Sequence, residues 1–381
     1  MSERIRILHC LSYVATGGVE RRRLILARGL PRERYEQRLV ARSASGPISD
    51  ELRAAGVPVD LVGGTSFFDV RAYARGIRIA RDFRPHIVHG AVFEGVGLAV
   101  ALGHAVGATV VVEETSHAIN RSRAGHALFR ALAFSADACV AISPAVASYL
   151  EKVTRVPTAR ITVIENGAVE PRVDAGVTRE SSRRALGLAE NDFVVGCVCR
   201  LVDDSNKRVS DLIRALALLA PGEPRLRLLV VGDGLQRAML EQLALQLGVA
   251  GRVAFAGHRE DVGNCYVAMD VFALVSRNEG FGLVAPEAMF CSLPVVATRV
   301  GGLVNIVVDG VTGKLIPPCE PVAIAQALNE LIHDPELCLR MGQAGRVRAH
   351  ERFSAARYTR DVERFYQRLL DVRGTSRRGA A

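Results

Sequence analysis

The stretch that decides the fold is VVGCVCRLVDDSNKRVSDLIRALALLAPGEPRLRLLVV, residues 194–231. Its two ends, 194–199 and 227–231, are short apolar runs rich in valine and leucine, which predict buried strands. Residues 208–219 between them place apolar side chains at helical spacing and predict an amphipathic helix. A strand, a helix and a second strand in this order predict two parallel strands with the helix packed on their sheet.

The same alternation continues through the rest of the chain. Helices are predicted at 21–30 and 70–83, among others. Further strands are predicted at 5–11, 38–42, 57–62, 87–90, 109–113, 139–142, 161–164, 253–256, 271–275 and 295–298. A chain of 381 residues is long enough for two domains. The sequence therefore predicts an α/β fold with two Rossmann-like, doubly wound domains that face each other across a cleft.

The domain boundary is predicted near 166–186, where glycine, proline and mixed charges interrupt the pattern. The N-terminal domain then spans 1–175 and the C-terminal domain 176–352. Residues 353–372 predict a helix that packs back across the domains. The remaining residues, 373–381, predict a disordered tail.

Composition argues against several classes of protein. Aromatic residues make up 5% of the chain and tryptophan is absent, so stacking on nucleic-acid bases is not expected. The eight cysteines lack zinc-ligand spacing and predict reduced thiols in a cytoplasmic protein. The longest apolar stretch, 96–112, contains three glycines and a histidine and predicts a helix followed by a strand rather than a membrane span. We expect no metal, no cofactor and no nucleic-acid partner.

Two cations flank the polar loop 201–206. Arg200 precedes this loop, and Lys207, one of only three lysines in the chain, follows it. Two cations that converge on a pyrophosphate neutralise the charge that develops on a nucleotide leaving group. The alternative is that they pair with Asp203 and Asp204 at the surface, where such ion pairs contribute little to stability.

A glycine loop with two carboxylates, NEGFGLVAPE at residues 278–287, follows the fourth predicted strand of the same domain. Its glycines let the backbone approach a phosphate or a sugar. Glu279 and Glu287 are acceptors for sugar or ribose hydroxyls. The alternative for Glu287, in the first helical turn after Pro286, is that it only complements the helix dipole.

Two motifs of the first domain also follow predicted strands. Gly17 and Gly18 precede a helix, where their amides either contact a phosphate or form a plain tight connection. They do not form a dinucleotide fingerprint or a P-loop, which argues against NAD and ATP. His117 follows the strand 109–113 and either donates to a sugar or is structural. Because ligands of doubly wound sheets bind at the carboxyl ends of strands, these motifs and those of the second domain are predicted to meet in the cleft.

Two basic amphipathic stretches suggest contact with an anionic membrane. Residues 71–83 place Arg71, Arg75 and Arg78 on one helical face, and residues 121–134 mix arginine with leucine and phenylalanine. Such helices bind anionic lipid at the bilayer surface. The alternative is that both helices cover a core, and that the net charge of +9 reflects an arginine-rich composition.

Together these residues resemble glycosyltransferase family 4, the retaining nucleotide-sugar transferases of GT-B fold, over nearly the whole chain. The matching segments are 17–20, the His117 segment, 164–167, Arg200 with Lys207, 231–234, 278–282, 287–289, 293–298, 301–302 and 309–313. The interval from Arg200 to Lys207 is longer than the commonest family spacing. Asn305 and Ser292 stand where Glu and Gly are frequent.

The resemblance implies roles for single residues. It implies that Glu287 binds the ribose, that Glu279 holds the donor sugar and that His117 touches this sugar. The implied catalytic residues are His117, Arg200, Lys207 and Glu279. The implied donor-binding residues are Gly17, Gly18, Arg200, Lys207, Gly232, Gly234, Glu279, Gly280, Phe281, Gly282, Leu283 and Glu287. The departing phosphate itself would assist deprotonation of the acceptor, without a metal.

We therefore expect a cytoplasmic, retaining hexosyltransferase at the inner face of the cytoplasmic membrane. It would use a UDP- or GDP-sugar and a glycan or lipid-linked acceptor in the synthesis of lipopolysaccharide or exopolysaccharide. The alternatives are a nucleotide-sugar epimerase or glycan phosphorylase on a similar scaffold, and a catalytically silent protein that binds sugar nucleotides. Scarcity of lysine disfavours a pyridoxal-phosphate phosphorylase, and the intact charged motifs argue against a silent protein.

Overall fold

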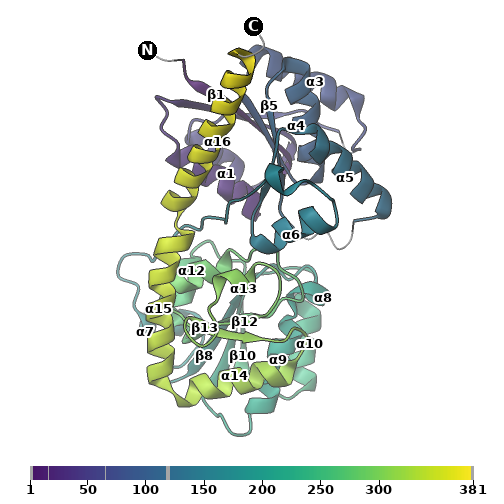
Figure 1. Cartoon of the computed structure of the whole chain (residues 1–381). Helices are drawn as coiled ribbons and strands as arrows, with labels where there is room; N and C mark the ends of the chain where they lie inside the picture. The colour runs from purple at the N-terminus through teal and green to yellow at the C-terminus, as the bar shows by residue number, and fades with distance from the viewer. Residues whose placement is uncertain (1–2, 16, 65, 117–120, 379–381) are drawn as a thin grey trace. The chain divides into compact units, whose positions relative to one another are not determined.

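The protein, described from a computed structural model, divides into two compact units. The structure describes residues 3–15, 17–64, 66–116 and 121–378. Unit 1 contains residues 1–167 together with 355–381, and unit 2 contains residues 168–354 (Figure 1). The boundary thus falls between 167 and 168 rather than between 175 and 176. Its position follows from the backbone, because the Ala168 amide donates to the Phe353 carbonyl at 2.7 Å and joins this segment to unit 2.

Unit 1 is built on a seven-stranded parallel sheet in the order β3-β2-β1-β4-β5-β6-β7. Its strands are β1 (Ile5–Val14), β2 (Tyr35–Ala44), β3 (Val59–Leu61), β4 (Ile87–Ala91), β5 (Thr109–Glu114), β6 (Ala138–Ala141) and β7 (Ile161–Val163). Its helices are α1 (Gly18–Gly29), α2 (Pro47–Ala54), α3 (Val70–Phe83), α4 (Phe93–Val106), α5 (Arg123–Ser135), α6 (Pro144–Lys152) and α16 (Ala355–Arg378). Each strand predicted in this part of the chain coincides with one of these strands.

Helices cover both faces of this sheet because successive side chains of a strand point to opposite faces. Ile7 of β1 packs with Ile25 of α1 and with Tyr366 of α16. Its neighbour Leu8 belongs to a separate apolar cluster with Leu98 of α4. The central strands are therefore buried on both sides, as the predicted doubly wound fold requires.

The C-terminal helix α16 belongs to unit 1. Its buried side chains that join the core around β1 are Tyr358, Val362, Phe365 and Tyr366. The helix continues to Arg378, so the predicted disordered tail is wrong for residues 373–378. A helix that is already anchored by packing extends by fixing one residue for each added hydrogen bond. Residues 379–381 lie outside the described residues.

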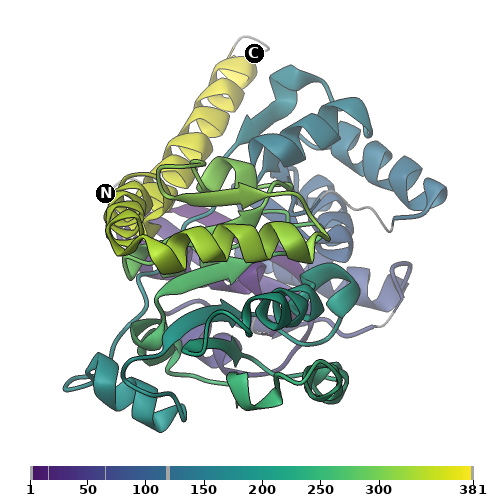
Figure 2. The same ribbon diagram turned by 90° about the horizontal axis from the view of Figure 1, so that it is seen from below.

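Unit 2 repeats the scheme with a six-stranded parallel sheet in the order β10-β9-β8-β11-β12-β13 (Figure 2). Its strands are β8 (Phe193–Val198), β9 (Leu226–Val231), β10 (Val253–Gly257), β11 (Val271–Leu274), β12 (Val295–Thr298) and β13 (Gly313–Ile316). Its helices are α7 (Arg179–Ala185), α8 (Asp204–Lys207), α9 (Val209–Leu219), α10 (Arg237–Gln246), α11 (Val262–Ala268), α12 (Val284–Phe290), α13 (Leu303–Ile306), α14 (Pro321–His333) and α15 (Pro335–Phe353). Strand β13 was not predicted.

The apolar stretch 96–112 forms most of α4 and the first part of β5, as predicted. Gly103 lies where α4 packs on β5, and a β-carbon there would come within 2.4 Å of the Val110 side chain. The stretch is thus the contact between a helix and a strand. Among the described residues, no helix combines the length and apolarity needed to cross a bilayer.

Candidate active site

The two predicted phosphate-binding cations lie after β8, on the turn into α9. Arg200 is exposed, and its guanidinium has no ion pair or hydrogen bond within the part of the chain that the structure describes. The loop predicted after it contains the short helix α8. Asp203 begins this helix by accepting from the Ser205 amide at 2.9 Å, and Asp204 accepts from the Ser210 amide at 3.0 Å.

Lys207 pairs with Glu279 rather than with the aspartates of its own loop. Its Nζ atom lies 2.7 Å from Glu279 Oε2. The alternative of a surface pair with Asp203 or Asp204 is therefore wrong. The Arg277 amide also donates to the Asn206 carbonyl at 2.7 Å, which fixes the loops after β8 and β11 side by side. Since these strands are neighbours and parallel, the carboxyl edge of the sheet brings two of the predicted catalytic residues together.

Gly232 and Gly234 support this edge through close backbone contact. Both have positive φ angles, 130° and 152°. A β-carbon on Gly232 would lie 1.9 Å from the Cys199 carbonyl oxygen, and one on Gly234 would lie 2.5 Å from that of Leu201. The two glycines therefore let the backbone after β9 pack against the residues on either side of Arg200. Their observed role is to position the loop of Arg200.

The glycine loop after β11 is fixed by its one aromatic residue. The Phe281 side chain is 2% exposed and packs edge-on against Phe353, with ring centroids 5.9 Å apart. Gly282 has a φ of 95°, which favours glycine. The backbone amides of Phe281, Gly282 and Leu283 have no acceptor among the described residues. The anchored ring thus holds a short run of amides that remain available to a ligand.

Glu287 is held from the side by a residue that the sequence did not indicate. The carboxylate lies in the first turn of α12 and is 8% exposed. The Tyr266 hydroxyl of α11 donates to Glu287 Oε2 at 3.2 Å. A glutamate that only complemented a helix dipole would not need such a partner, so the fixed orientation favours a binding role. No spacing in the sequence connects Tyr266 with Glu287, because they meet only through packing.

Gly17 and Gly18 lie at the start of α1 in unit 1. Gly17 is the N-cap residue, and no side chain caps this helix. A β-carbon on Gly17 would lie 2.5 Å from a carboxylate oxygen of Glu20, which folds back over the turn. A side chain at Gly17 would thus displace Glu20. His117, the predicted contact to the donor sugar, lies outside the described residues.

Glu113, which precedes the predicted His117 site, lies in a buried charge cluster in unit 1. Its carboxylate pairs with Arg22, and with Arg23 at 2.7 Å. His89 Nε2 lies 3.2 Å from the same carboxylate, and His89 Nδ1 lies 2.6 Å from the Tyr366 hydroxyl of α16. Burial alone would raise the pKa of Glu113, but the charges of Arg22 and Arg23 hold it well below its usual value. Glu113 therefore connects α1, the sheet and α16.

This cluster predicts that acid destabilises unit 1. His9 of β1 is also buried, and its ring lies 6.2 Å from that of His89. Burial lowers the pKa of His89 to about 4 and that of His9 well below its usual value. Unfolded imidazoles take up a proton near pH 6.5 while the folded ones stay neutral, so the unfolded state binds more protons in this window. Each imidazole should then remove ~1.4 kcal/mol per pH unit as the pH falls. Urea unfolding between about pH 7 and pH 5 measures this slope.

The matched comparison for the acid prediction uses a second histidine substitution. His89→Asn should reduce the pH dependence, because it removes one of the two responsible imidazoles. His104→Asn is the control, because this exposed histidine of α4 lies outside the buried charge cluster. Equal slopes in both variants and the wild type would contradict the assignment.

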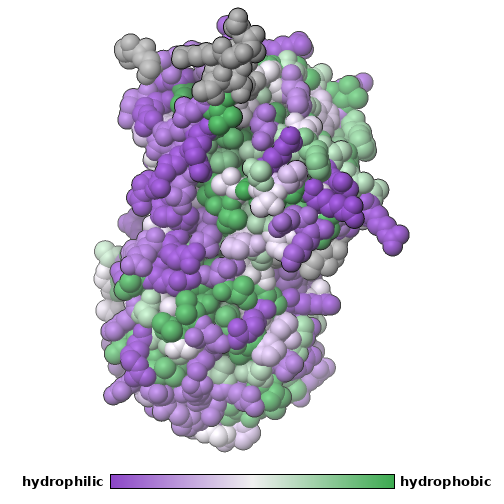
Figure 3. Space-filling model, in the orientation of Figure 1, coloured by the Kyte–Doolittle hydropathy of each residue, from purple (hydrophilic) through white to green (hydrophobic). Residues whose placement is uncertain are grey.

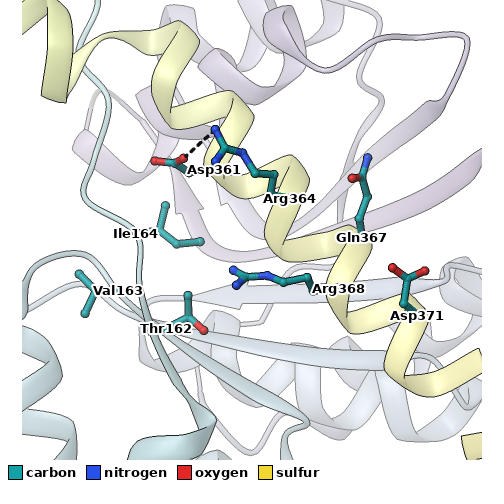
Figure 4. A pocket seen from close by; sticks show the side chains of 8 residues that line it. All are labelled: Thr162, Val163, Ile164, Asp361, Arg364, Gln367, Arg368 and Asp371. Carbon is teal, nitrogen blue, oxygen red and sulfur yellow. Dashed lines mark ion pairs between the residues drawn. The ribbon is translucent and has the colours of Figure 1, made fainter. Parts of the chain in front are cut away.

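Two hollows lie outside these loops. One, of about 500 Å³, lies between β7 and α16. Two arginines and two aspartates line it, and Arg364 pairs with Asp361 at 3.8 Å (Figure 4). A second hollow, of about 770 Å³, lies in unit 2 and includes Tyr266 in its wall. None of the predicted site residues lines either hollow.

The sequence matches two known families in the same order as the two units. Residues 17–167 match the glycosyl transferase 4-like domain, and residues 178–348 match the glycosyl transferases of group 1. The chain belongs to the group 1 glycosyltransferases. Both matched segments contain the motifs that carried the resemblance to glycosyltransferase family 4, which is thereby confirmed.

Named relatives of this group 1 glycosyltransferase align mainly over half of the chain. A D-inositol 3-phosphate glycosyltransferase of Corynebacterium urealyticum is 39% identical over 196 residues, which is 49% of this chain and 46% of the relative. An N-acetyl-alpha-D-glucosaminyl L-malate synthase of Bacillus anthracis is 32% identical over 192 residues, 49% of each chain. The chain thus spans about half the length of the curated relatives it matches.

Solved structures match the group 1 glycosyltransferase over nearly its whole length. HepE of Anabaena in complex with UDP is 24% identical with a TM-score of 0.85, covering 96% of this chain and 100% of that one. Sucrose-phosphate synthase from Thermosynechococcus elongatus is 21% identical with a TM-score of 0.80, covering 97% and 100%. These likenesses show the fold: the two Rossmann-like units are those of the GT-B fold, as predicted.

Proposed function

We propose that this chain is a retaining glycosyltransferase that transfers a hexosyl unit from a UDP- or GDP-sugar to a glycan or lipid-linked acceptor. The observation that carries the proposal is the Lys207–Glu279 pair at the carboxyl edge of β8 and β11. In this pair, a cation that can bind a phosphate lies next to a carboxylate that can accept from hydroxyls. Both lie at the carboxyl edge of the sheet, where doubly wound sheets bind ligands. The family match supports transfer as the reaction class.

The diphosphate of the donor would contact Arg200 and Lys207. Arg200 is exposed, with its guanidinium uncommitted among the described residues, and Lys207 is partly exposed. A diphosphate would compete with Glu279 for Lys207 and so release the carboxylate. The two cations then stabilise the negative charge that develops as the bond from sugar to phosphate breaks. We therefore propose that the reaction needs no metal.

The sugar and the nucleoside would contact the second loop. Glu279, released from Lys207, accepts from hydroxyls of the hexose, next to the amides of Phe281, Gly282 and Leu283. Glu287, oriented by Tyr266, accepts from ribose hydroxyls. The proposed donor gains support from HepE, whose structures hold UDP, UDP with glucose, and UDP-glucose.

We propose that the acceptor binds to unit 1, the N-terminal domain, because the Lys207–Glu279 pair proposed for the donor lies in unit 2. For Gly17 and Gly18, at the start of α1, we keep the predicted role as donor-binding residues. We propose a role in the synthesis of cell-surface polysaccharide. The first acceptors to test are lipid-linked glycans, followed by inositol 3-phosphate and malate, for which two relatives are named.

A thermal-shift screen of UDP, GDP, ADP and their sugars tests donor binding. One nucleotide should raise the unfolding midpoint with rising concentration, because binding adds about 2.7 kcal/mol to the free energy of unfolding at a hundredfold excess over Kd. Glu287→Ala should lose this shift because the ribose loses its acceptor.

Glu336→Ala is the matched control for that screen. Glu336 also lies in the first turn of a helix, α15, but is exposed in unit 2. Its substitution should preserve the nucleotide shift. The donor site would be wrongly assigned if no nucleotide shifted the wild type, or if Glu287→Ala responded as the wild type does.

A further inference from the structure

One helix of unit 1 exposes a row of arginines without acidic partners. The solvent side of α3 carries Arg71, Arg75, Arg78 and Arg81, all exposed. Among the described residues none of these four side chains has an ion pair or a hydrogen bond. The same side holds one acidic residue, Asp82, so four positive charges and one negative charge leave a net charge of +3. We call this surface the α3 face.

Elsewhere on the same unit, some exposed arginines are paired, whereas others, such as Arg123 and Arg130, have no ion pair among the described residues. Arg28 of α1 pairs with Glu51 at 2.8 Å, and Arg53 pairs with Asp50 at 2.9 Å. The α3 face is a local concentration of uncompensated positive charge, because four exposed arginines on one side of a single helix share it with only one acidic residue among those described. A concentration of this kind attracts a negatively charged surface.

Two large apolar side chains extend from the N-terminal end of the α3 face. Phe68 is 73% exposed and Val70 is 77% exposed. Apolar and polar side chains both reach the surface of this part of unit 1, over α3 and α4 (Figure 3). We call Phe68 and Val70 the apolar tip.

The apolar tip is presented by an ordered backbone. Asp69 caps α3 by accepting from the amides of Arg71 and Ala72 at 3.0 and 3.2 Å. The preceding ring, Phe67, points inward and contacts Phe93 with ring centroids 5.1 Å apart. Arg42 holds the Phe67 carbonyl at 3.1 Å. Phe67 is thus partly buried. The Phe68 ring meets it edge-on at 5.1 Å but stays mostly in water, which costs hydration free energy unless a partner covers the ring.

We propose that the α3 face and the apolar tip dock unit 1 on an anionic lipid bilayer. The arginines contact lipid phosphates, and Phe68 and Val70 enter the acyl boundary. A nucleic acid would match the arginines but would leave the apolar tip in water. A bilayer satisfies both features, since its charged headgroups adjoin an apolar layer. This docking does not depend on the proposed transfer reaction.

Of the two helices predicted to contact a membrane, the structure favours α3 over α5. Arg121, which precedes α5, pairs with Glu114 at 2.9 Å and lies over the Phe129 ring at 4.3 Å. Phe129 itself is buried. Arg121 and Phe129 are therefore used within unit 1. Arg123, Arg130 and Phe134 of this stretch stay exposed, but Phe134 at 41% is less exposed than Phe68 at 73%.

Vesicle flotation of the full chain tests the charge part of the proposal. At low salt the wild type should float with vesicles that contain phosphatidylglycerol and stay behind with phosphatidylcholine alone. The triple variant Arg71→Gln, Arg75→Gln, Arg78→Gln should bind roughly 100-fold more weakly. The control Arg172→Gln, Arg225→Gln, Arg340→Gln removes equal charge from exposed positions of unit 2 and should bind as the wild type does.

A tryptophan reporter tests the apolar tip independently of charge. The chain has no tryptophan, so Phe68→Trp introduces a single one. Its emission should shift to shorter wavelength with phosphatidylglycerol vesicles, whereas that of Leu235→Trp, at an 88% exposed position of unit 2, should not.

The proposal is overturned if the wild type does not float at low salt, if both triple variants bind equally, or if vesicles leave the emission of the Phe68→Trp variant unchanged. It is also overturned if the arginine variant loses self-association while its vesicle binding is intact, because the α3 face would then bind a second copy of the chain.

Discussion

Replacing Glu113 by alanine should lower the free energy of unfolding of unit 1 by about 3–5 kcal/mol. Glu113 is the acid that compensates Arg22 and Arg23, and all three side chains are at most 2% exposed. Removal of the carboxylate leaves two guanidinium groups buried without a counter-charge, which costs far more than the net contribution of the ion pairs. Urea denaturation followed by circular dichroism measures the loss.

The control for this prediction is Glu51→Ala. Glu51 also pairs with an arginine of α1, Arg28, but both side chains are largely exposed. Its substitution should cost less than about 1 kcal/mol. If Glu113→Ala cost no more than Glu51→Ala, the buried cluster would not be the link between α1 and the sheet.

Arg200→Ala and Lys207→Ala should each lower kcat by about 100- to 1,000-fold. Each removes one positive group from the proposed diphosphate site, where charge develops in the transition state. The rate to follow is release of the nucleotide diphosphate from the donor that the thermal-shift screen selects. Because the interaction strengthens in the transition state, the effect should fall on kcat more than on KM.

Arg214→Ala serves as the matched variant for these two. Arg214 is a partly exposed arginine of the nearby helix α9, and it pairs with Asp211 at 3.3 Å. Its loss should leave kcat within about twofold of the wild type. Normal turnover in both Arg200→Ala and Lys207→Ala would remove the basis for metal-free stabilisation of the leaving group.

Most strands were predictable because they are apolar runs, and the central ones are buried on both faces. Strand β13 escaped because Gly313–Ile316 is short and contains a glycine and a lysine. Its place in the sheet comes from pairing with β12, a contact that local sequence does not report. Helix α8 escaped for a similar reason. It is only four residues long, and the polar residues from its N-cap Asp203 onward are typical of the loop that was predicted.

Within the site, sequence located the charged residues but not their partners. The spacing of the two loops could not indicate that Lys207 meets Glu279 or that Tyr266 meets Glu287, because strand order decides both contacts. Phe281 was predicted as a donor-binding residue, and the sequence did not indicate that its buried side chain anchors the loop in the core. Gly232 was expected at the donor, and the structure adds its close approach to Cys199.

A crystal structure with the nucleotide diphosphate selected by the thermal-shift screen tests the central claim most directly. We predict that the diphosphate contacts Arg200 and Lys207, that Lys207 Nζ leaves Glu279 Oε2, and that the ribose hydroxyls face Glu287. A nucleotide bound elsewhere, with the 2.7 Å pair of Lys207 and Glu279 intact, would contradict the account.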